Sequence, residues 1–136
     1  MNVIMTCGGT GGHIYPAIAI ADKIKEHHPD ANVLFIGTKK GMENQLVPAA
    51  GYEIKGIDAS GIDRHHLVTN IKTLRDAMKG SQEAYHIIKD FKPDVAIGTG
   101  GYVTGGVLFT ASRLGIPCYI HEQNAVVGVA NKISSS

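Results

Sequence analysis

The chain has 136 residues, of which 43% are apolar and 18% charged, and its formal net charge is +1. This length suits a single domain with a buried core, and the near-neutral charge argues against nucleic acid as a partner. No stretch approaches the roughly 20 apolar residues of a membrane-spanning helix, and the N-terminal apolar run is too short for a signal peptide. We therefore expect a soluble, cytoplasmic protein.

The chain opens with a short apolar strand, predicted at Asn2–Thr6. A glycine-rich loop, Gly8–Gly12, follows it directly. Apolar residues at helical spacing then predict a helix over Pro16–His28, because proline is favoured in the first turn of a helix. Strand, glycine loop and helix thus follow one another at the start of the chain.

The middle of the chain repeats this alternation. Asn32–Thr38 reads as a buried strand, and residues 41–51 read as a short helix that ends at a glycine. Tyr52–Asp58 alternates apolar and polar residues, which is typical of a strand near the edge of a sheet. After a polar loop, a long helical stretch is predicted from about Leu67 to Phe91.

The last third adds two strands and two helices. Residues 93–101 form an apolar strand that runs into glycines, and Gly105–Leu114 is the next predicted helix. Residues 117–124 give the final strand, and Val126–Lys132 the start of a helix that the sequence "SSS" cuts off. From this abrupt end we expect the sequence to be a piece of a longer protein.

Five strands alternating with helices predict an α/β fold with a Rossmann-like, doubly wound parallel sheet. Right-handed crossovers favour the strand order 3-2-1-4-5. Ligands of such sheets bind at the carboxyl ends of the strands, at the switch point between strands 1 and 4. Both glycine loops, Gly8–Gly12 and Gly98–Gly106, leave from those two strands.

Glycine loops between a strand and a helix favour a phosphate or diphosphate ligand. Without a Cβ, the backbone can approach the ligand closely, and the N–H groups at the helix start attract an anion. The alternative is a tight turn needed only for packing. Two such loops at adjacent strand ends favour the anion site.

Common nucleotide motifs fit poorly. The dinucleotide fingerprint G-x-G-x-x-G fails because Ile14 takes the third glycine position, and Lys39-Lys40 stand where an acidic ribose partner is expected. No glycine precedes the Lys-Ser or Lys-Thr of a P-loop, and the seven histidines lack metal-ligand spacing. Cys7 and Cys118 are interpreted as reduced core thiols, with a catalytic cysteine as the minor alternative.

Polar side chains gather at the same edge. His13 follows the first loop, where a histidine suits proton transfer near neutral pH, unless it only hydrogen-bonds backbone. Glu122 and Asn124 lie at the end of the last strand: Glu122 is a second candidate acid or base, or orients His13, and Asn124 could hold sugar hydroxyls or phosphate. Tyr102, in the second loop, could bind in the same way or simply pack.

Three segments with these residues resemble the MurG family of bacterial glycosyltransferases, which add N-acetylglucosamine to the lipid-linked muramoyl-pentapeptide precursor of peptidoglycan. They are "GGTGGHIYPAIAIA", "KPDVAIGTGGYVTGG" and "HEQNAVVGVANK". The resemblance covers nearly the whole chain. It departs where the family usually has serine and then Gly-Pro, since Thr104-Gly105-Gly106 stand here; threonine keeps the hydroxyl.

The resemblance implies a GT-B architecture, with residues 1–136 as the N-terminal, acceptor-binding Rossmann-like domain and a C-terminal donor domain absent from this sequence. It implies an inverting hexosyltransferase with two substrates, UDP-N-acetylglucosamine and the lipid-diphosphate-linked muramoyl-pentapeptide. No cofactor is expected, and the lack of an acidic DxD-like pair agrees with a reaction that needs no metal. The fragment alone is expected to be inactive.

The resemblance also assigns roles to residues. His13 matches the proposed general base, and the Thr10-Gly11-Gly12 segment and Asn124 match positions used at the donor sugar nucleotide. Glu122 is a second candidate catalytic residue. The glycine loops would hold the acceptor's diphosphate. The remaining predicted substrate-binding positions are Gly100, Gly101, Tyr102, Thr104, Gln123 and Asn131.

One helical segment bears on membrane binding. Within residues 63–80, apolar side chains form a stripe flanked by basic ones; the stripe is Leu67, Ile71, Leu74 and Met78. Residues alone favour an ordinary core-facing helix. The resemblance favours an interfacial helix at the cytoplasmic membrane surface, because the acceptor is embedded there.

Two other functions remain open at this point. The chain could be a non-catalytic module that docks on the membrane or on a separate catalytic chain. It could also be a generic nucleotide-binding Rossmann domain, although Lys39-Lys40 disfavour that interpretation.

Overall fold

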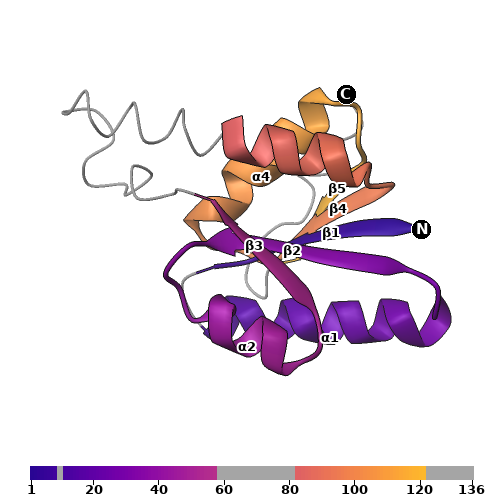
Figure 1. The fold of residues 1–136 in the computed structure, drawn as a ribbon, viewed down its shortest axis with the longest axis vertical. Helices are drawn as coiled ribbons and strands as arrows, with labels where there is room; N and C mark the ends of the chain where they lie inside the picture. The colour runs from indigo at the N-terminus through magenta and orange to yellow at the C-terminus, as the bar shows by residue number, and fades with distance from the viewer. Residues whose placement is uncertain (9–10, 58–81, 122–136) are drawn as a thin grey trace.

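The computed structural model describes residues 1–8, 11–57 and 82–121, with Tyr102 described by its backbone alone. Five parallel strands form one sheet (Figure 1). They are β1 (Asn2–Thr6), β2 (Asn32–Thr38), β3 (Glu53–Ile57), β4 (Val95–Gly98) and β5 (Cys118–Ile120). Their order is β3-β2-β1-β4-β5, which confirms the predicted topology. The switch point between β1 and β4 therefore lies where the sequence places both glycine loops.

Helices cover both faces of the sheet. Helices α1 (Gly11–His27) and α2 (Glu43–Ala49) lie on one face, while residues 82–91, which are helical, and α4 (Tyr102–Arg113) lie on the other (Figure 1). No helix in the described ranges is both long enough and apolar enough to cross a membrane.

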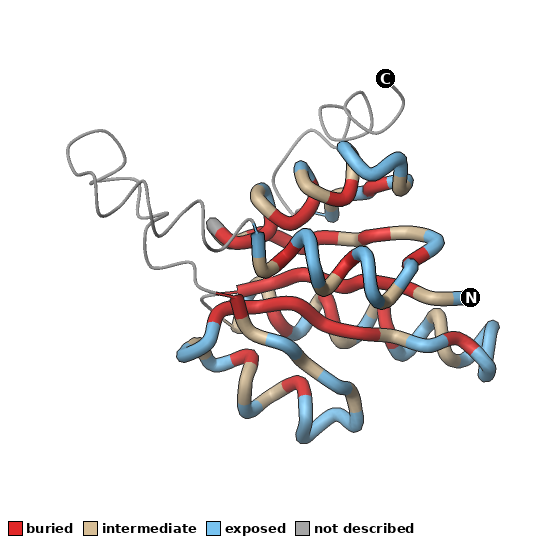
Figure 2. Tube along the Cα trace, turned by 45° about the horizontal axis from the view of Figure 1, so that its top comes forward, coloured by how far each residue is buried: buried red, intermediate tan, exposed pale blue. Residues whose placement is uncertain are grey.

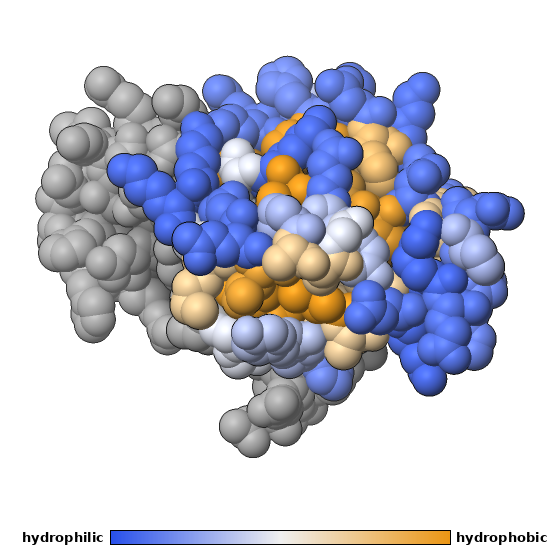
Figure 3. All heavy atoms as spheres, turned by 60° about the horizontal axis from the view of Figure 1, so that its bottom comes forward, coloured by the Kyte–Doolittle hydropathy of each residue, from blue (hydrophilic) through white to orange (hydrophobic). Residues whose placement is uncertain are grey.

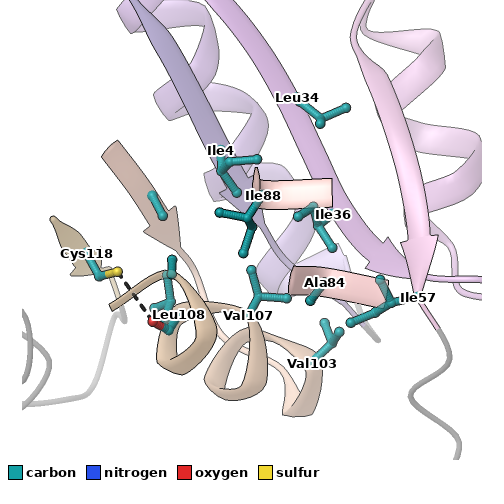
Figure 4. Close-up of a cluster of buried hydrophobic side chains, with 12 residues drawn as sticks. Ile4, Leu34, Ile36, Ile57, Ala84, Ile88, Val103, Val107, Leu108 and Cys118 are labelled. Carbon is teal, nitrogen blue, oxygen red and sulfur yellow. Dashed lines mark hydrogen bonds between the residues drawn. The ribbon is translucent and has the colours of Figure 1, made fainter. Parts of the chain in front are cut away.

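Alternation along β1 separates two cores. Val3 and Met5 pack with Ile14 and Phe35 under α1, whereas Ile4 points to the opposite face. There a second cluster joins the sheet to α4 and to helix 82–91, with the Cys118 thiol donating to Leu108 O at 3.4 Å (Figure 4). The central strands are buried on both sides, as parallel sheets require (Figure 2). From the side of α1 and α2, apolar side chains gather between hydrophilic ones (Figure 3).

The strands follow the sequence prediction closely, but two helix starts were placed wrongly. Helix α1 begins at Gly11 rather than Pro16, and α4 begins at Tyr102 rather than Gly105. In both cases the helix starts inside the glycine loop. Pro16 is therefore an interior residue, and it cannot donate the hydrogen bond to Gly12 that an ordinary residue would make. The helices predicted over residues 67–81 and 126–132 lie outside the described residues.

Candidate functional site

The two glycine loops touch each other through their backbones. A Cβ on Gly101 would lie 2.5 Å from Gly8 O and 3.2 Å from Gly8 N, so only glycine permits this approach. Gly101 also has φ +97°, a conformation that L side chains rarely adopt. Both loops follow the central strands β1 and β4, which pair through Thr6 and Gly98. The site is thus assembled by direct contact between segments more than 90 residues apart.

His13 lies against the second loop, with its ring on the backbone of Gly100. A Cβ on Gly100, whose φ is +115°, would lie 2.5 Å from His13 Nδ1. The histidine is half-buried in the first turn of α1. Its place on the helix is fixed from the other side as well, because the Thr99 hydroxyl donates to His13 O at 2.5 Å.

The tautomer of His13 follows from its partner. Nδ1 lies 3.2 Å from Thr99 O, and a carbonyl oxygen only accepts hydrogen bonds, so Nδ1 carries the proton. In the neutral ring this leaves Nε2 with a free lone pair. The geometry therefore presents a histidine whose Nε2 can accept a proton.

Hydroxyl groups hold the second loop together from beneath. Thr104 is buried, and its hydroxyl is 2.7 Å from Gly100 O and 3.4 Å from Thr6 O. The Thr104 hydroxyl is thus engaged within the loop, and its assignment to substrate stays a prediction. Thr6 is fully buried, and its own hydroxyl has no hydrogen-bond partner within the described part of the chain.

Two helix N-termini converge here. Gly11 and Gly12 form the first turn of α1, and Gly101 is the N-cap of α4, where no side chain caps the helix. Uncapped N–H groups at a helix start, at the positive end of its dipole, attract anions. Within the described ranges, no group of three His, Cys, Asp or Glu side chains could hold a metal ion. The two helix starts, with their free N–H groups, suit an anionic ligand held by backbone amides.

A buried carboxylate lies behind the first loop. Glu43 has no exposed surface, and the Thr38 hydroxyl donates to its Oε1 at 3.2 Å. The nearby Cys7 thiol is equally buried; burial first, and then the Glu43 carboxylate, raises the pKa of Cys7 to about 12. Cys7 is a free thiol that stays protonated at neutral pH, which agrees with the core interpretation rather than a reactive thiolate.

The structure brings together part of the predicted set. His13, Gly11, Gly12, Gly100 and Gly101 meet at one edge. Outside the described residues lie Thr10, Glu122, Gln123, Asn124 and Asn131. Tyr102 opens α4, and its side chain is not described.

Sequence reasoning missed Thr99 and Glu43. Thr99 contacts His13 through its backbone carbonyl and through a short hydrogen bond from its hydroxyl, and no sequence pattern predicts either contact. Glu43 did offer a signal, since it is an acidic residue in the first helical turn after β2, at the same edge of the sheet.

Comparison with known proteins identifies relatives along the whole chain. Residues 3–136 match the model of the glycosyltransferase family 28 N-terminal domain. A UDP-N-acetylglucosamine–N-acetylmuramyl-(pentapeptide) pyrophosphoryl-undecaprenol N-acetylglucosamine transferase of Alkaliphilus oremlandii is 56% identical over 133 residues, covering 98% of this chain and 36% of the relative. The transferase of the same name from Clostridioides difficile is 52% identical, covering 99% of this chain and 33% of the relative. The chain thus spans about a third of the length of these relatives.

Solved structures agree. MurG of Acinetobacter baumannii superposes with a TM-score of 0.79 at 36% identity, covering 98% of this chain and 38% of that one. The Streptomyces glycosyltransferase SsfS6, solved with thymidine diphosphate, has a TM-score of 0.66 at 16% identity, which shows the shared fold alone; the match covers 98% of this chain and 42% of that one. Because the family model spans nearly the whole sequence, this chain belongs to the glycosyltransferase family 28 N-terminal domain family.

Proposed function

We propose that residues 1–136 are the N-terminal, acceptor-binding domain of a GT-B glycosyltransferase. The complete enzyme would transfer N-acetylglucosamine from UDP-N-acetylglucosamine to the lipid-diphosphate-linked N-acetylmuramoyl-pentapeptide of peptidoglycan synthesis. Family membership supports the reaction class, and the names of relatives 52–56% identical support the two substrates. The matched family model is an N-terminal domain and the relatives are longer than this chain, which supports a further, C-terminal domain. That this domain supplies most of the donor site is proposed from the family resemblance.

The hydrogen bond from His13 Nδ1 to Thr99 O carries the mechanistic part of the proposal. With the proton on Nδ1, the lone pair of Nε2 is available to take a proton, as a general base requires. The acceptor's sugar hydroxyl gives its proton to Nε2 as its oxygen bonds to the anomeric carbon of the donor. The bond from that carbon to the diphosphate breaks on the opposite side, and UDP leaves with the electron pair, so the configuration inverts.

The glycine loops would hold the acceptor's diphosphate. Gly100 and Gly101 let the His13 ring and Gly8 pack against the second loop, and the starts of α1 and α4 would supply N–H groups to the phosphate oxygens. In this proposal Thr10 and Asn124 contribute at the donor sugar nucleotide, and Glu122 acts beside His13. Gln123 and Asn131 remain proposed substrate contacts on the strength of the family resemblance.

His13 can be tested as the base in the complete enzyme with two variants and a control. His13→Ala should lower kcat by about two to four orders of magnitude with little change in acceptor KM. His13→Asn retains a donor near Nδ1 but lacks Nε2, so it should lose activity to a similar extent. His27→Ala, at the exposed end of the same helix, should behave like wild type. Near-wild-type kcat in His13→Asn would remove His13 as the base.

Peripheral association with the cytoplasmic membrane surface is part of this proposal. The stripe predicted within residues 63–80 is not described, but the outer face of α4 and helix 82–91 supports the same idea. Phe109 is 58% exposed with Arg113 5.9 Å from its ring centre, and Lys89 lies 5.4 Å from the ring centre of half-exposed Tyr85. Apolar rings flanked by cations suit an anionic lipid surface. Phe109→Asp should reduce co-sedimentation with phosphatidylglycerol vesicles; unchanged binding would exclude this face.

A further inference from the structure

Among the residues that the structure describes, Glu43 is the charged residue that is fully buried and that the proposed mechanism does not use. Three glycines leave room for its side chain. A Cβ on Gly8 would lie 2.9 Å from Glu43 Oε2, and one on Gly37 would lie 2.6 Å from Glu43 Cγ; a Cβ on Gly41 would overlap the carboxylate itself. Gly8 follows β1, Gly37 lies in β2, and Gly41 lies in the turn after β2. The carboxylate therefore occupies a chamber between two central strand ends and the first glycine loop.

Hydrogen bonds hold the Glu43 carboxylate in this chamber. The Gly41 N–H donates to Thr38 Oγ1 at 3.0 Å, and the Thr38 hydroxyl donates in turn to Glu43 Oε1 at 3.2 Å. The Thr38 N–H reaches Oε2 only at 3.5 Å. Burying a carboxylate is unfavourable unless it is well paired, and a core alone would be served by an apolar side chain. The unfavourable free energy of burying the Glu43 carboxylate points to a role beyond filling space.

Contacts lead from Glu43 to the ligand-facing backbone. Its Oε2 lies against Gly8, whose carbonyl contacts Gly101 in the second loop. Gly101 is the N-cap of α4, and the ring of His13 packs against the backbone of its neighbour Gly100. Glu43 Oε2 and Val103 each lie 2.9 Å from the position that a Cβ on Gly8 would take. Without the carboxylate, Gly8 could shift into the chamber and away from Gly101, which would loosen the contact between the loops.

We propose that Glu43 is a positioning residue: its carboxylate packs against Gly8 and so keeps Gly8 in contact with Gly101, which holds the two glycine loops in the arrangement that binds an acceptor diphosphate. Its effect on binding rests on the function proposed above. Its effect on the backbone does not, because the contact between Gly8 and Gly101 can be followed without any ligand.

The first test compares backbone amide shifts of ¹⁵N-labelled variants of this chain without ligand. Glu43→Ala removes the support, and Glu43→Gln keeps the shape and an oxygen that accepts from Thr38. Val47→Ala is the matched control, because Val47 is a fully buried residue of the same helix that packs in the α1-side core. We expect Glu43→Ala to move the amides of Gly8, Gly100 and Gly101, while Glu43→Gln and Val47→Ala leave Gly100 and Gly101 in place. Unmoved Gly100 and Gly101 in Glu43→Ala would overturn the proposal.

The second test measures binding of a soluble short-chain prenyl-diphosphate-N-acetylmuramoyl-peptide. Glu43→Ala should raise Kd at least about tenfold, while Glu43→Gln stays within about threefold of wild type. Val47→Ala should lower the melting temperature yet leave Kd unchanged. If Glu43 only stabilised the fold, Glu43→Ala would behave like Val47→Ala and leave Kd unchanged as well. Equal Kd for Glu43→Ala and wild type would overturn the positioning role, as would an equal loss in Glu43→Gln.

Two further outcomes are separable. If wild type does not bind the acceptor probe, the proposed function fails, and the ligand-free shifts still decide the role of Glu43. If Glu43→Ala does not fold, Glu43→Asp takes its place, because the shorter side chain withdraws from Gly8 while keeping its charge. Wild-type shifts at Gly100 and Gly101 in Glu43→Asp would contradict the proposal.

Discussion

The two glycine loops look alike in sequence but need their glycines for different reasons. In the first loop, Gly8 is needed for space alone, because Glu43 and Val103 lie where its Cβ would be. In the second loop, Gly100 and Gly101 are needed for conformation as well, with φ +115° and +97°. A few residues further on, nothing lies near the missing Cβ of Gly105 or of its neighbour. The glycines of one segment can therefore be needed for space, for conformation or for neither, and only the structure shows which applies to each.

The largest expected effect comes from Gly101→Ala. The alanine would need a positive φ and would place its Cβ 2.5 Å from Gly8 O, so both conformation and contact oppose it. We expect the free energy of unfolding to fall by about 2–4 kcal/mol, measured by urea unfolding. Acceptor binding should weaken as well, because the two loops would separate. A loss below about 0.5 kcal/mol would contradict the description of the loop contact.

A smaller effect concerns the residue before the first loop. An unfolded cysteine has a pKa near 9.0, while folding raises that of Cys7 to about 12. Below pH 9 both states keep the proton and stability is unaffected. From pH 9 to 12 the unfolded state loses its proton first, so the free energy of unfolding falls by about 1.4 kcal/mol per pH unit.

Comparison of wild type with Cys7→Ala isolates this term, since Cys118 and the other titrating groups are common to both. Between pH 8 and pH 10, wild type should lose about 1.4 kcal/mol more than the variant in urea unfolding. Parallel losses would show that Cys7 titrates normally and that the end of β1 is open to water.

The smallest effect has the opposite sign. Gly105 is exposed inside α4, has open space at its Cβ and does not need a positive φ. Gly105→Ala should therefore raise the free energy of unfolding by about 0.5–1 kcal/mol, because alanine is the better helix former. The same urea experiment measures it beside Gly101→Ala. Destabilisation by Gly105→Ala would mean that Gly105 is needed as much as Gly101, and it would contradict the distinction drawn between these two glycines.

Strands were easier to predict than helix starts. Asn2–Thr6 and Asn32–Thr38 were predicted at their observed bounds, because buried parallel strands are short apolar runs that turn signals delimit. Helix α1 begins five residues before Pro16, because its first turn lies inside the glycine loop, and glycine has a low intrinsic preference for helix. The preference of proline for the first turn was misleading here.

The candidate site was predicted only where side-chain chemistry or glycine marks it. His13 and the two loops follow from residue type and topology, because parallel strands bring their carboxyl ends to one edge. Thr99 contributes through its carbonyl, which every residue has, so its identity gives no signal. Glu43 is a buried carboxylate that hydrogen-bonds Thr38 in a space left by three glycines, and that arrangement appears only after folding.

The central claim is that the glycine loops and His13 form an acceptor site. The most direct measurement titrates the ¹⁵N-labelled chain separately with a soluble lipid-diphosphate-muramoyl acceptor analogue, UDP-N-acetylglucosamine and NADH. We predict saturable shifts from the acceptor at Gly8, Gly11–His13 and Gly100–Thr104, and weak or no response to the other two. Saturable binding of NADH without a response to the acceptor would contradict the account and assign these loops to dinucleotide binding.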